Sequence, residues 1–157
     1  MIKDIDFREA TQDDLPEITS IYRDTIRAVN SRDYSEEQIE AWSSGADDLK
    51  KWQDRIKKFY FLVAEVDNQI VGFTYLKNGF YLENIFVHKD FQGKTVGSKL
   101  LRIMESQVLM NGHNVIKSDI STSAFPFFDS HYYDVGKKQK KSFKGQVFDI
   151  YVVFKEL

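Results

Sequence analysis

The segment Leu82–Leu101 holds the residues whose types and spacing best suit chemistry on an anion. A run of β-forming apolar residues is followed by a turn, Gln92–Gly97, after which apolar residues recur at three- and four-residue spacing, as in a helix. Glycines let a backbone come close to a ligand, and unpaired N–H groups at a helix start attract anions. Lys94 would add positive charge. The segment therefore predicts either a phosphate-binding turn or an ordinary strand-to-helix connection without a ligand.

A nucleotide-binding P-loop is excluded for this turn. Gly93, Lys94 and Thr95 imitate the end of that motif, but the motif also needs a glycine five residues before Gly93. Because His88 stands there, the sequence does not predict an ATPase or a GTPase.

The strand, turn and helix together resemble the acetyl-CoA-binding motif of the GNAT superfamily of N-acetyltransferases. In that motif a strand is followed by Gln/Arg-x-x-Gly-x-Gly/Ala and a helix, and here the turn Gln92–Gly97 reads QGKTVG. Thr95 replaces the first motif glycine, and a β-branched residue adopts a positive φ reluctantly. We expect this departure to weaken cofactor affinity.

The resemblance implies acetyl-CoA as co-substrate and assigns its contacts. The pyrophosphate would lie on the N–H groups from Gln92 to Ser98, and the pantetheine arm would pair with the strand at Ile85–Val87. Ser121 would contact the pantetheine, as polar residues at that place do in the family, or would only cap a helix. The cofactor-binding residues so implied are Ile85, Phe86, Val87, Gln92, Gly93, Lys94, Thr95, Val96, Gly97, Ser98, Ser121 and Phe128.

The segment Ala124–Tyr133 resembles the A-x-P-F-Y-E-x-x-G-F segment of small bacterial GNAT proteins. In the family, the tyrosine of this segment commonly hydrogen-bonds the leaving CoA sulfur as general acid. Phe128 stands there in this chain and can donate no proton. Tyr132 replaces the glycine that ends the helix, and a non-glycine residue in the left-handed region carries strain.

Two residues are candidates to replace the missing acid. Tyr132 lies four residues after Phe128, so the two share a face if the helix continues for another turn, which makes Tyr132 a candidate catalytic residue. His131 lies three residues after Phe128 and is a weaker candidate. The alternative is that these aromatic residues belong to the core and that the thiolate leaves without a dedicated acid, since thiols ionise near pKa ~8.5.

Glu83 is the candidate general base. A primary amine resembles lysine, with a pKa of ~10.4, and must lose a proton before it attacks the thioester. Alternation along the strand places Glu83 on one face with Tyr81 and Ile85, next to the expected cofactor site. The competing interpretation is a solvated glutamate or an ion-pair partner. The oxyanion would be held by a strand N–H near Phe86 or Val87.

The acceptor pocket of similar proteins is shaped by the first two helices and the loop between them. In this chain that region includes Tyr34, Glu36, Glu37 and Trp42. Acidic residues there would suit a cationic amine, but acidic residues at a helix N-terminus stabilise the macrodipole in any protein. The sequence therefore assigns no particular acceptor.

Composition limits the chemistry. The 157 residues suit one domain, 1–157, and 22 basic against 24 acidic residues give a net charge of −2, so nothing global attracts nucleic acid or an anionic membrane. Without cysteine the chain has no thiolate metal site and no acyl-cysteine intermediate, so acyl transfer would be direct. The three histidines lack metal-ligand spacing, and we predict no metal.

Location and partners follow from weaker signals. The first residues are too charged for a secretory signal and no apolar run reaches membrane-spanning length, so we expect a cytoplasmic protein without membrane contact. The basic run Lys137–Lys141, with Lys144, is typical of a solvated connection between strands; contact with the adenosine phosphates of CoA and protection of an edge strand are alternatives. We predict no nucleic acid partner, and a homodimer only by analogy with similar proteins.

Hydrophobic periodicity and turn residues predict the order of the elements. Helices are expected at Thr11–Val29, Ser35–Trp42, around Leu49–Ile56, from Gly97 to about Asn111, and from around Ser121–Pro126. Strands are expected at Ile5–Arg8, Phe59–Val66, Gln69–Leu76, Phe80–Val87, Val115–Ile120, Val135–Lys138 and Gln146–Phe154. This order matches the GNAT pattern and implies an α+β fold with a mixed, mostly antiparallel central sheet, flanking helices and splayed central strands.

Two classes of function fit these observations. The first is an acetyl-CoA-dependent N-acetyltransferase that moves an acetyl group directly to a primary amine of a small molecule or a peptide. The second is a GNAT-like acyl-CoA-binding module with weak or no catalysis that acts through protein interaction, as Thr95, Phe128 and Tyr132 together would allow.

Overall fold

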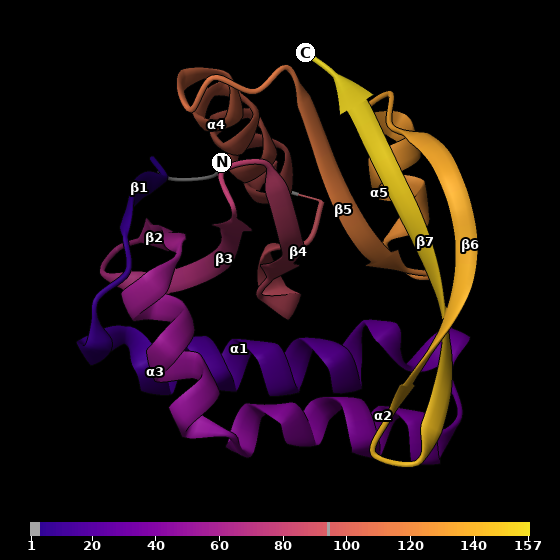
Figure 1. Cartoon of the computed structure of the whole chain (residues 1–157). Helices are drawn as coiled ribbons and strands as arrows, with labels where there is room; N and C mark the ends of the chain where they lie inside the picture. The colour runs from indigo at the N-terminus through magenta and orange to yellow at the C-terminus, as the bar shows by residue number, and fades with distance from the viewer. Residues whose placement is uncertain (1–3, 94) are drawn as a thin grey trace.

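The computed structural model describes residues 4–93 and 95–157. It is built on a seven-stranded sheet with the order β1-β2-β3-β4-β5-β7-β6 (Figure 1). The strands are β1 (Asp6–Glu9), β2 (Tyr60–Val66), β3 (Gln69–Lys77), β4 (Tyr81–Val87), β5 (Val115–Ser121), β6 (Asp134–Phe143) and β7 (Gln146–Glu156). The α-helices are α1 (Leu15–Ala28), α2 (Glu36–Ser43), α3 (Leu49–Lys58), α4 (Val96–Met110) and α5 (Phe125–Ser130).

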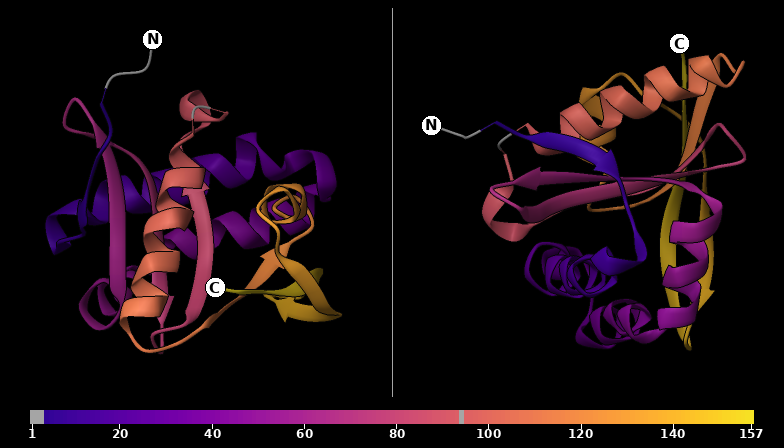
Figure 2. Two further views of the ribbon diagram at one scale, coloured as in Figure 1. Left: turned by 90° about the horizontal axis from the view of Figure 1, so that it is seen from above. Right: turned by 90° about the vertical axis from the view of Figure 1, so that its left-hand side faces the viewer.

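Helices cover both faces of the sheet (Figure 2). α1 and α3 pack on one face through Ile18, Ile26 and Trp52, which join a buried cluster with the aromatic residues of β2 and β3. α4 packs on the other face through Leu100 and Met104. The apolar residues of β2 point alternately to the two clusters, because successive side chains of a strand face opposite sides of a sheet. The predicted α+β layering is confirmed.

Tight turns set the register of β2, β3 and β4. Asp67 and Asn68 have φ of 51° and 65°, and Asn78 and Gly79 have φ of 55° and 82°. Two successive residues with positive φ give the turn whose twist matches a hairpin, and asparagine, aspartate and glycine tolerate that geometry best. Both hairpins lie where the sequence predicted them.

The centre of the sheet splits between β4 and β5, its one parallel pair. These strands are in register at Tyr81↔Lys117 and Leu82↔Ser118, where the Ser118 hydroxyl donates to the Leu82 carbonyl at 2.8 Å. Beyond this point β5 pairs only with β7, up to Ser121↔Ile150. The carboxyl ends of β4 and β5 therefore diverge, as the GNAT resemblance implied (Figure 1).

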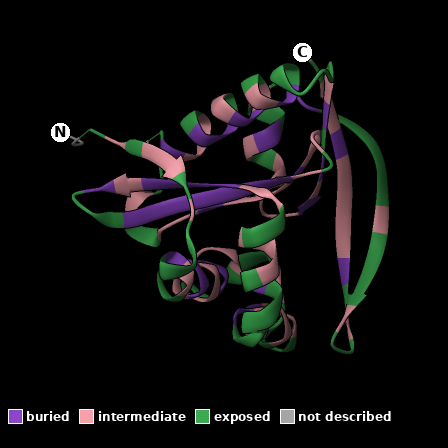
Figure 3. Cartoon of the chain, turned by 60° about the vertical axis from the view of Figure 1, so that its left-hand side comes forward, coloured by how far each residue is buried: buried purple, intermediate pink, exposed green. Residues whose placement is uncertain are grey.

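The C-terminal hairpin is longer than predicted. β6 was expected only at Val135–Lys138, yet it extends to Phe143 and pairs with β7 down to Phe143↔Gln146. The interpretation of the lysine run as a connection between strands is wrong, because an edge strand pairs through its backbone and can leave its side chains in water. β6 is exposed along most of its length (Figure 3), and the hairpin extends past the sheet toward α2 (Figure 1).

Candidate active site

A β-bulge distorts β4 next to the split. The pairs Phe73↔Phe86 and Tyr75↔Glu83 leave one residue of β3 opposite two of β4, Asn84 and Ile85. The buried Thr74 hydroxyl fixes this irregularity by donating to the Glu83 carbonyl at 2.8 Å. Since a bulge leaves an extra residue unpaired and bends the strand, β4 turns here and no longer follows β5.

The amide of Val87 points into the split. His88 donates its amide to the Val71 carbonyl at 2.8 Å, which makes that position a hydrogen-bonded pair. The neighbouring pair Gly72↔Val87 is then a non-hydrogen-bonded pair, because the two kinds alternate along an antiparallel ladder. The N–H of Val87 faces away from β3, on the side from which β5 has departed, and it is available to an extended ligand.

A small cavity of about 140 Å³ lies in the split, between β4, α1 and α5. Its lining includes seven of the residues implied as cofactor contacts, and these are Ile85, Phe86, Val87, Gln92, Gly97, Ser121 and Phe128. Gly93, Thr95, Val96 and Ser98 do not line it, and Lys94 lies outside the described residues. Residues of the sequence motif therefore form part of the wall of the small cavity, and the remaining motif residues lie outside that wall.

Three amides at the start of α4 have no partner among the residues that the structure describes. α4 starts at Val96, and its first backbone bond runs from the Lys99 amide to the Thr95 carbonyl at 3.0 Å. The amides of Val96, Gly97 and Ser98 donate to no other residue in the described ranges, and the Thr95 side chain does not cap the helix. Unpaired amides at a helix start favour the binding of an anion.

Thr95 occupies the left-handed region at φ 68°, ψ 0°. This is the strained geometry anticipated for a β-branched residue in place of the motif glycine, and it costs on the order of 1–3 kcal/mol. The side chain of Gln92 secures the turn by donating to the Val87 carbonyl at 2.6 Å. The helix start with its unpaired amides therefore follows a threonine in a strained backbone conformation.

Gly97 is needed where α4 meets α5. A Cβ placed there would lie 3.2 Å from the ring of Phe127, tighter than ordinary van der Waals contact. Ser98 reinforces the junction, because its Oγ lies 2.9 Å from Nε2 of His131 while Nδ1 of His131 lies 2.8 Å from the Phe127 carbonyl. A carbonyl only accepts, so in neutral His131 the proton sits on Nδ1 and Nε2 accepts from Ser98. His131 therefore joins the two helices.

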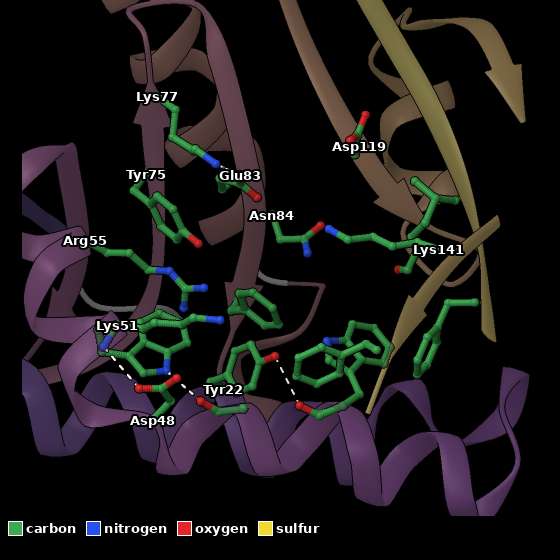
Figure 4. Close-up of a pocket in the computed structure, with 18 of the residues that line it drawn as sticks. Tyr22, Asp48, Lys51, Arg55, Tyr75, Lys77, Glu83, Asn84, Asp119 and Lys141 are labelled. Atoms are coloured by element: carbon green, nitrogen blue, oxygen red, sulfur yellow. Dashed lines mark hydrogen bonds and ion pairs between the residues drawn. The ribbon is translucent and has the colours of Figure 1, made fainter. Parts of the chain in front are cut away.

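A large cavity of about 520 Å³ adjoins the small one. The two share four lining residues, Trp42, Asn84, Phe86 and Ser121, which lie at the bulge, at α2 and at the end of β5. The remaining wall comes from α1, α3, β3 and the β6–β7 hairpin (Figure 4). A ligand in each cavity would meet its neighbour beside the β4 bulge.

Aromatic rings make much of the large cavity's wall. Tyr22 donates its hydroxyl to the Trp42 carbonyl at 3.1 Å, and the Trp52 indole donates to the Gly45 carbonyl at 3.0 Å. Burial raises the pKa of Tyr22 to about 12, and the nearby charge of Arg55 opposes this rise. These polar atoms are satisfied within the wall, so the rings offer apolar faces to a ligand.

Two carboxylates face the large cavity from adjacent strands. Glu83 and Asp119 each follow the last paired residue of the parallel ladder, on β4 and β5. Oε1 of Glu83 lies 2.9 Å from Nζ of Lys77. Burial raises the pKa of Tyr81, and so does its hydrogen bond to Asp119, which fixes that carboxylate.

Comparison with known proteins identifies the fold and its chemistry. The family described as Acetyltransferase (GNAT) domain matches residues 30–148. The chain belongs to the GNAT family of acetyltransferases. It is 26% identical over 147 residues to YafP, an uncharacterized N-acetyltransferase of Escherichia coli strain K12, covering 94% of this chain and 93% of that protein. The predicted family, fold and enzyme class are confirmed.

Solved structures agree over the whole chain. A GCN5-related N-acetyltransferase from Rhodopseudomonas palustris matches with a TM-score of 0.96 and 29% identity, covering 100% of this chain and 98% of that one. The PaiA N-acetyltransferase of Thermoplasma acidophilum, in complex with coenzyme A, matches with a TM-score of 0.81 and 18% identity over 99% and 100%. Other GNAT structures hold acetyl-CoA. The prediction that acetyl-CoA is the co-substrate is confirmed.

Tyr132 is misplaced for the acid role suggested for it. α5 ends at Ser130, so Tyr132 does not share a helical face with Phe128. It stands at φ 69° and is 83% exposed, whereas Phe128 is 1% exposed and lines the small cavity. The backbone strain expected at Tyr132 is present. The prediction that α5 continues for another turn is wrong. A residue in the left-handed region turns the chain away from the helix axis.

Glu83 pairs with Lys77, which is the ion-pair alternative weighed for it, and it also lines the large cavity. Its role as general base stays a prediction. In the predicted acceptor region Tyr34 and Trp42 line that cavity, whereas Glu36 and Glu37 are exposed and do not. The acidic pocket suggested by those glutamates is therefore not formed by them. Tyr34 instead accepts a hydrogen bond from the Thr122 amide at 3.0 Å, next to Ser121.

Sequence reasoning missed the basic residues of this GNAT site. The large cavity is lined by Lys51, Arg55, Lys77, Lys141 and Lys144. Arg55 follows Trp52 by three residues on α3, a spacing that places them on one helical face. That spacing was a usable signal, but only the packing of α3 on the sheet shows that the face borders a cavity.

Metal-binding clusters and membrane-spanning helices are both absent from the described ranges. No cluster of three or more His, Cys, Asp or Glu side chains suited to a metal occurs there. None of the helices in that part of the chain combines the length and apolarity that crossing a bilayer requires. The absence of a metal and of nucleic acid, the cytoplasmic location and the homodimer stay predictions.

Proposed function

We propose that this GNAT protein, acting as one domain, transfers the acetyl group of acetyl-CoA directly to a primary amine of a small molecule or a peptide. The observation that carries the proposal is the junction of the two cavities at the β4 bulge. A donor in one and an amine in the other would place the thioester beside the amine without a covalent enzyme intermediate. Proximity of this kind replaces a bimolecular encounter by a bound one.

The donor would bind along β4 and α4. The diphosphate would accept from the amides of Val96, Gly97 and Ser98, and the pantetheine would extend along Ile85–Val87. The free amide of Val87 would donate to an amide oxygen of the pantetheine arm. The oxyanion donor near Phe86 or Val87 stays a prediction.

The reaction requires one proton to leave the amine and one to reach the sulfur. The amine nitrogen attacks the thioester carbonyl carbon and the carbon–sulfur bond breaks. Glu83 would take the proton from the nitrogen, directly or through a water. The thiolate would leave without help from Phe128 or Tyr132 and take a proton from solvent, which a thiol pKa of ~8.5 makes feasible.

A CoA-binding module is the second candidate, favoured by Thr95 at positive φ and by Phe128 in place of an acid. Two measurements separate the candidates. Calorimetry with CoA should show binding, and acetyl-CoA with a panel of primary amines should release free thiol faster than acetyl-CoA alone. CoA binding without amine-dependent thiol release would support the module, and absence of CoA binding would exclude both.

A further inference from the structure

The large cavity is positively charged although the chain carries a net charge of −2. Five basic and three acidic residues line it. Of the acids, Glu83 pairs with Lys77, Asp119 bonds Tyr81, and Asp48 caps α3 by accepting from the Lys51 amide at 3.3 Å. The acidic groups are therefore engaged, and a surplus of cations faces the ligand space.

Arg55 is the cation best arranged to bind an anion. Its guanidinium lies 4.4 Å from the ring centroid of Trp52 and 5.7 Å from that of Tyr75. No carboxylate pairs with it in the described part of the chain. Stacking on rings holds the planar group in place and leaves its N–H edge for a two-pronged contact with a carboxylate or phosphate.

The rest of the wall suits a flat apolar body. Tyr22, Trp42 and Phe148 present rings to the cavity, and the Tyr22 hydroxyl is already bonded to the Trp42 carbonyl. Arg55 reaches the large cavity from α3 (Figure 4). It does not line the small cavity, which shares Asn84 and Ser121 with the large one. A substrate must therefore extend from an anionic end at Arg55 to an amine at the bulge.

From this arrangement we infer that the acceptor is an aromatic primary amine that also carries an anionic group, held by Arg55. The inference rests on the proposed acetyl transfer and specifies its substrate class. Either a carboxylate or a phosphate can accept two hydrogen bonds from a guanidinium group, so either could be the anionic group of the acceptor.

Paired substrates test the anion. Thiol release from acetyl-CoA is measured with tryptophan against tryptamine, and with pyridoxamine 5′-phosphate against pyridoxamine. The anionic member of at least one pair should have a kcat/KM higher by roughly 10- to 100-fold, the range expected for hydrogen bonds to a charged group. The preferred pair identifies the source of the anion. Equal or better use of both neutral amines would overturn the inference.

Variants test the residue. Arg55→Gln should remove the preference, mainly by raising KM for the anionic amine, with CoA affinity unchanged. Arg55→Lys should keep part of it, because an ammonium retains charge but not the fork. Lys57→Gln is the matched control, since it makes the same charge change on an exposed position of α3 outside both cavities. A preference that survives in Arg55→Gln, or falls equally in Lys57→Gln, would overturn the role of Arg55.

Binding of the products separates this inference from the proposed catalysis. N-acetyltryptophan and N-acetyltryptamine, with the phosphate pair's N-acetyl derivatives, are titrated into the protein by calorimetry. If no amine accelerates thiol release but an anionic derivative binds at least 10-fold tighter in the wild type and not in Arg55→Gln, acetyl transfer fails while the anion site stands. Equal binding of the derivatives within both pairs would contradict the anion site whatever the activity.

Discussion

The small and the large cavity share the bulged strand β4, yet they are built in different ways. The small cavity depends on backbone geometry: a split between strands, an amide without a partner and a helix start. Most of it comes from one stretch of chain, 84–97, together with α5. The large cavity depends on side chains from α1, α3, β3 and the C-terminal hairpin. In the proposed function the first holds the acetyl-CoA, and the second holds the acceptor.

The largest effect should come from Glu83, which lines the large cavity and precedes Asn84, one of the residues that both cavities share. Glu83→Gln should lower kcat/KM by roughly 100-fold near neutral pH, the usual contribution of a general base. The loss should shrink as pH approaches the pKa of the acceptor amine, because free amine then needs no base. Initial rates of thiol release against pH measure this, with Glu36→Gln as a control at an exposed site. A loss below twofold would leave Asp119 or water as the base.

Gly97→Val should damage the small cavity selectively. The added side chain meets Phe127 and overpacks the α4–α5 junction, which moves the start of α4 away from the expected diphosphate position. CoA binding should weaken by roughly 10-fold or more, as expected when hydrogen bonds to a charged group are lost. Calorimetry with CoA measures it. Gly136→Val is the matched control, because a Cβ there has ordinary contacts of 3.5 Å and lies outside both cavities. Similar losses in both variants would contradict the assignment.

Two substitutions at strained positions should separate binding from stability. Thr95→Gly and Tyr132→Gly each remove a side chain at positive φ and should each raise the free energy of unfolding by about 1 kcal/mol. Only Thr95→Gly should also tighten CoA binding, because only that turn carries the open amides. Urea unfolding and calorimetry measure both. Slower thiol release in Tyr132→Gly would restore Tyr132 as a catalytic residue.

Alkaline pH should lower the free energy of unfolding, and tyrosines in the wall of the large cavity contribute to this loss. Burial raises the pKa of Tyr22 to about 12 and also raises the pKa values of Tyr75 and Tyr81, all in that wall. Above about pH 10 the unfolded chain loses these protons and the folded chain keeps them, so stability falls by roughly 1 kcal/mol per pH unit for each tyrosine. Below pH 10 the effect vanishes.

Unfolding of Tyr22→Phe between pH 9 and 11 checks this alkaline prediction. The variant should show a shallower decline than the wild type, because it has one fewer phenol to titrate. Parallel declines would mean that burial of Tyr22 does not control its ionisation.

The sequence predicted most of the fold because its signals are local. Asn78-Gly79 defined a hairpin, and the turn Gln92–Gly97 gave one edge of the small cavity. The failures have tertiary causes. Tyr132 could be placed only by knowing where α5 ends, and the pocket role of Arg55 depends on α3 packing against a sheet that is distant in sequence. The full length of β6 could not be predicted, because the strand is held by backbone pairing with β7 and its exposed side chains show no apolar alternation.

A crystal structure with bound CoA is the most direct measurement of the central claim. We predict the diphosphate on the amides of Val96, Gly97 and Ser98, the pantetheine along Ile85–Val87, and the sulfur beside Asn84 and Ser121, where the cavities meet. CoA found elsewhere on the molecule, or a sulfur pointing away from the large cavity, would contradict the account.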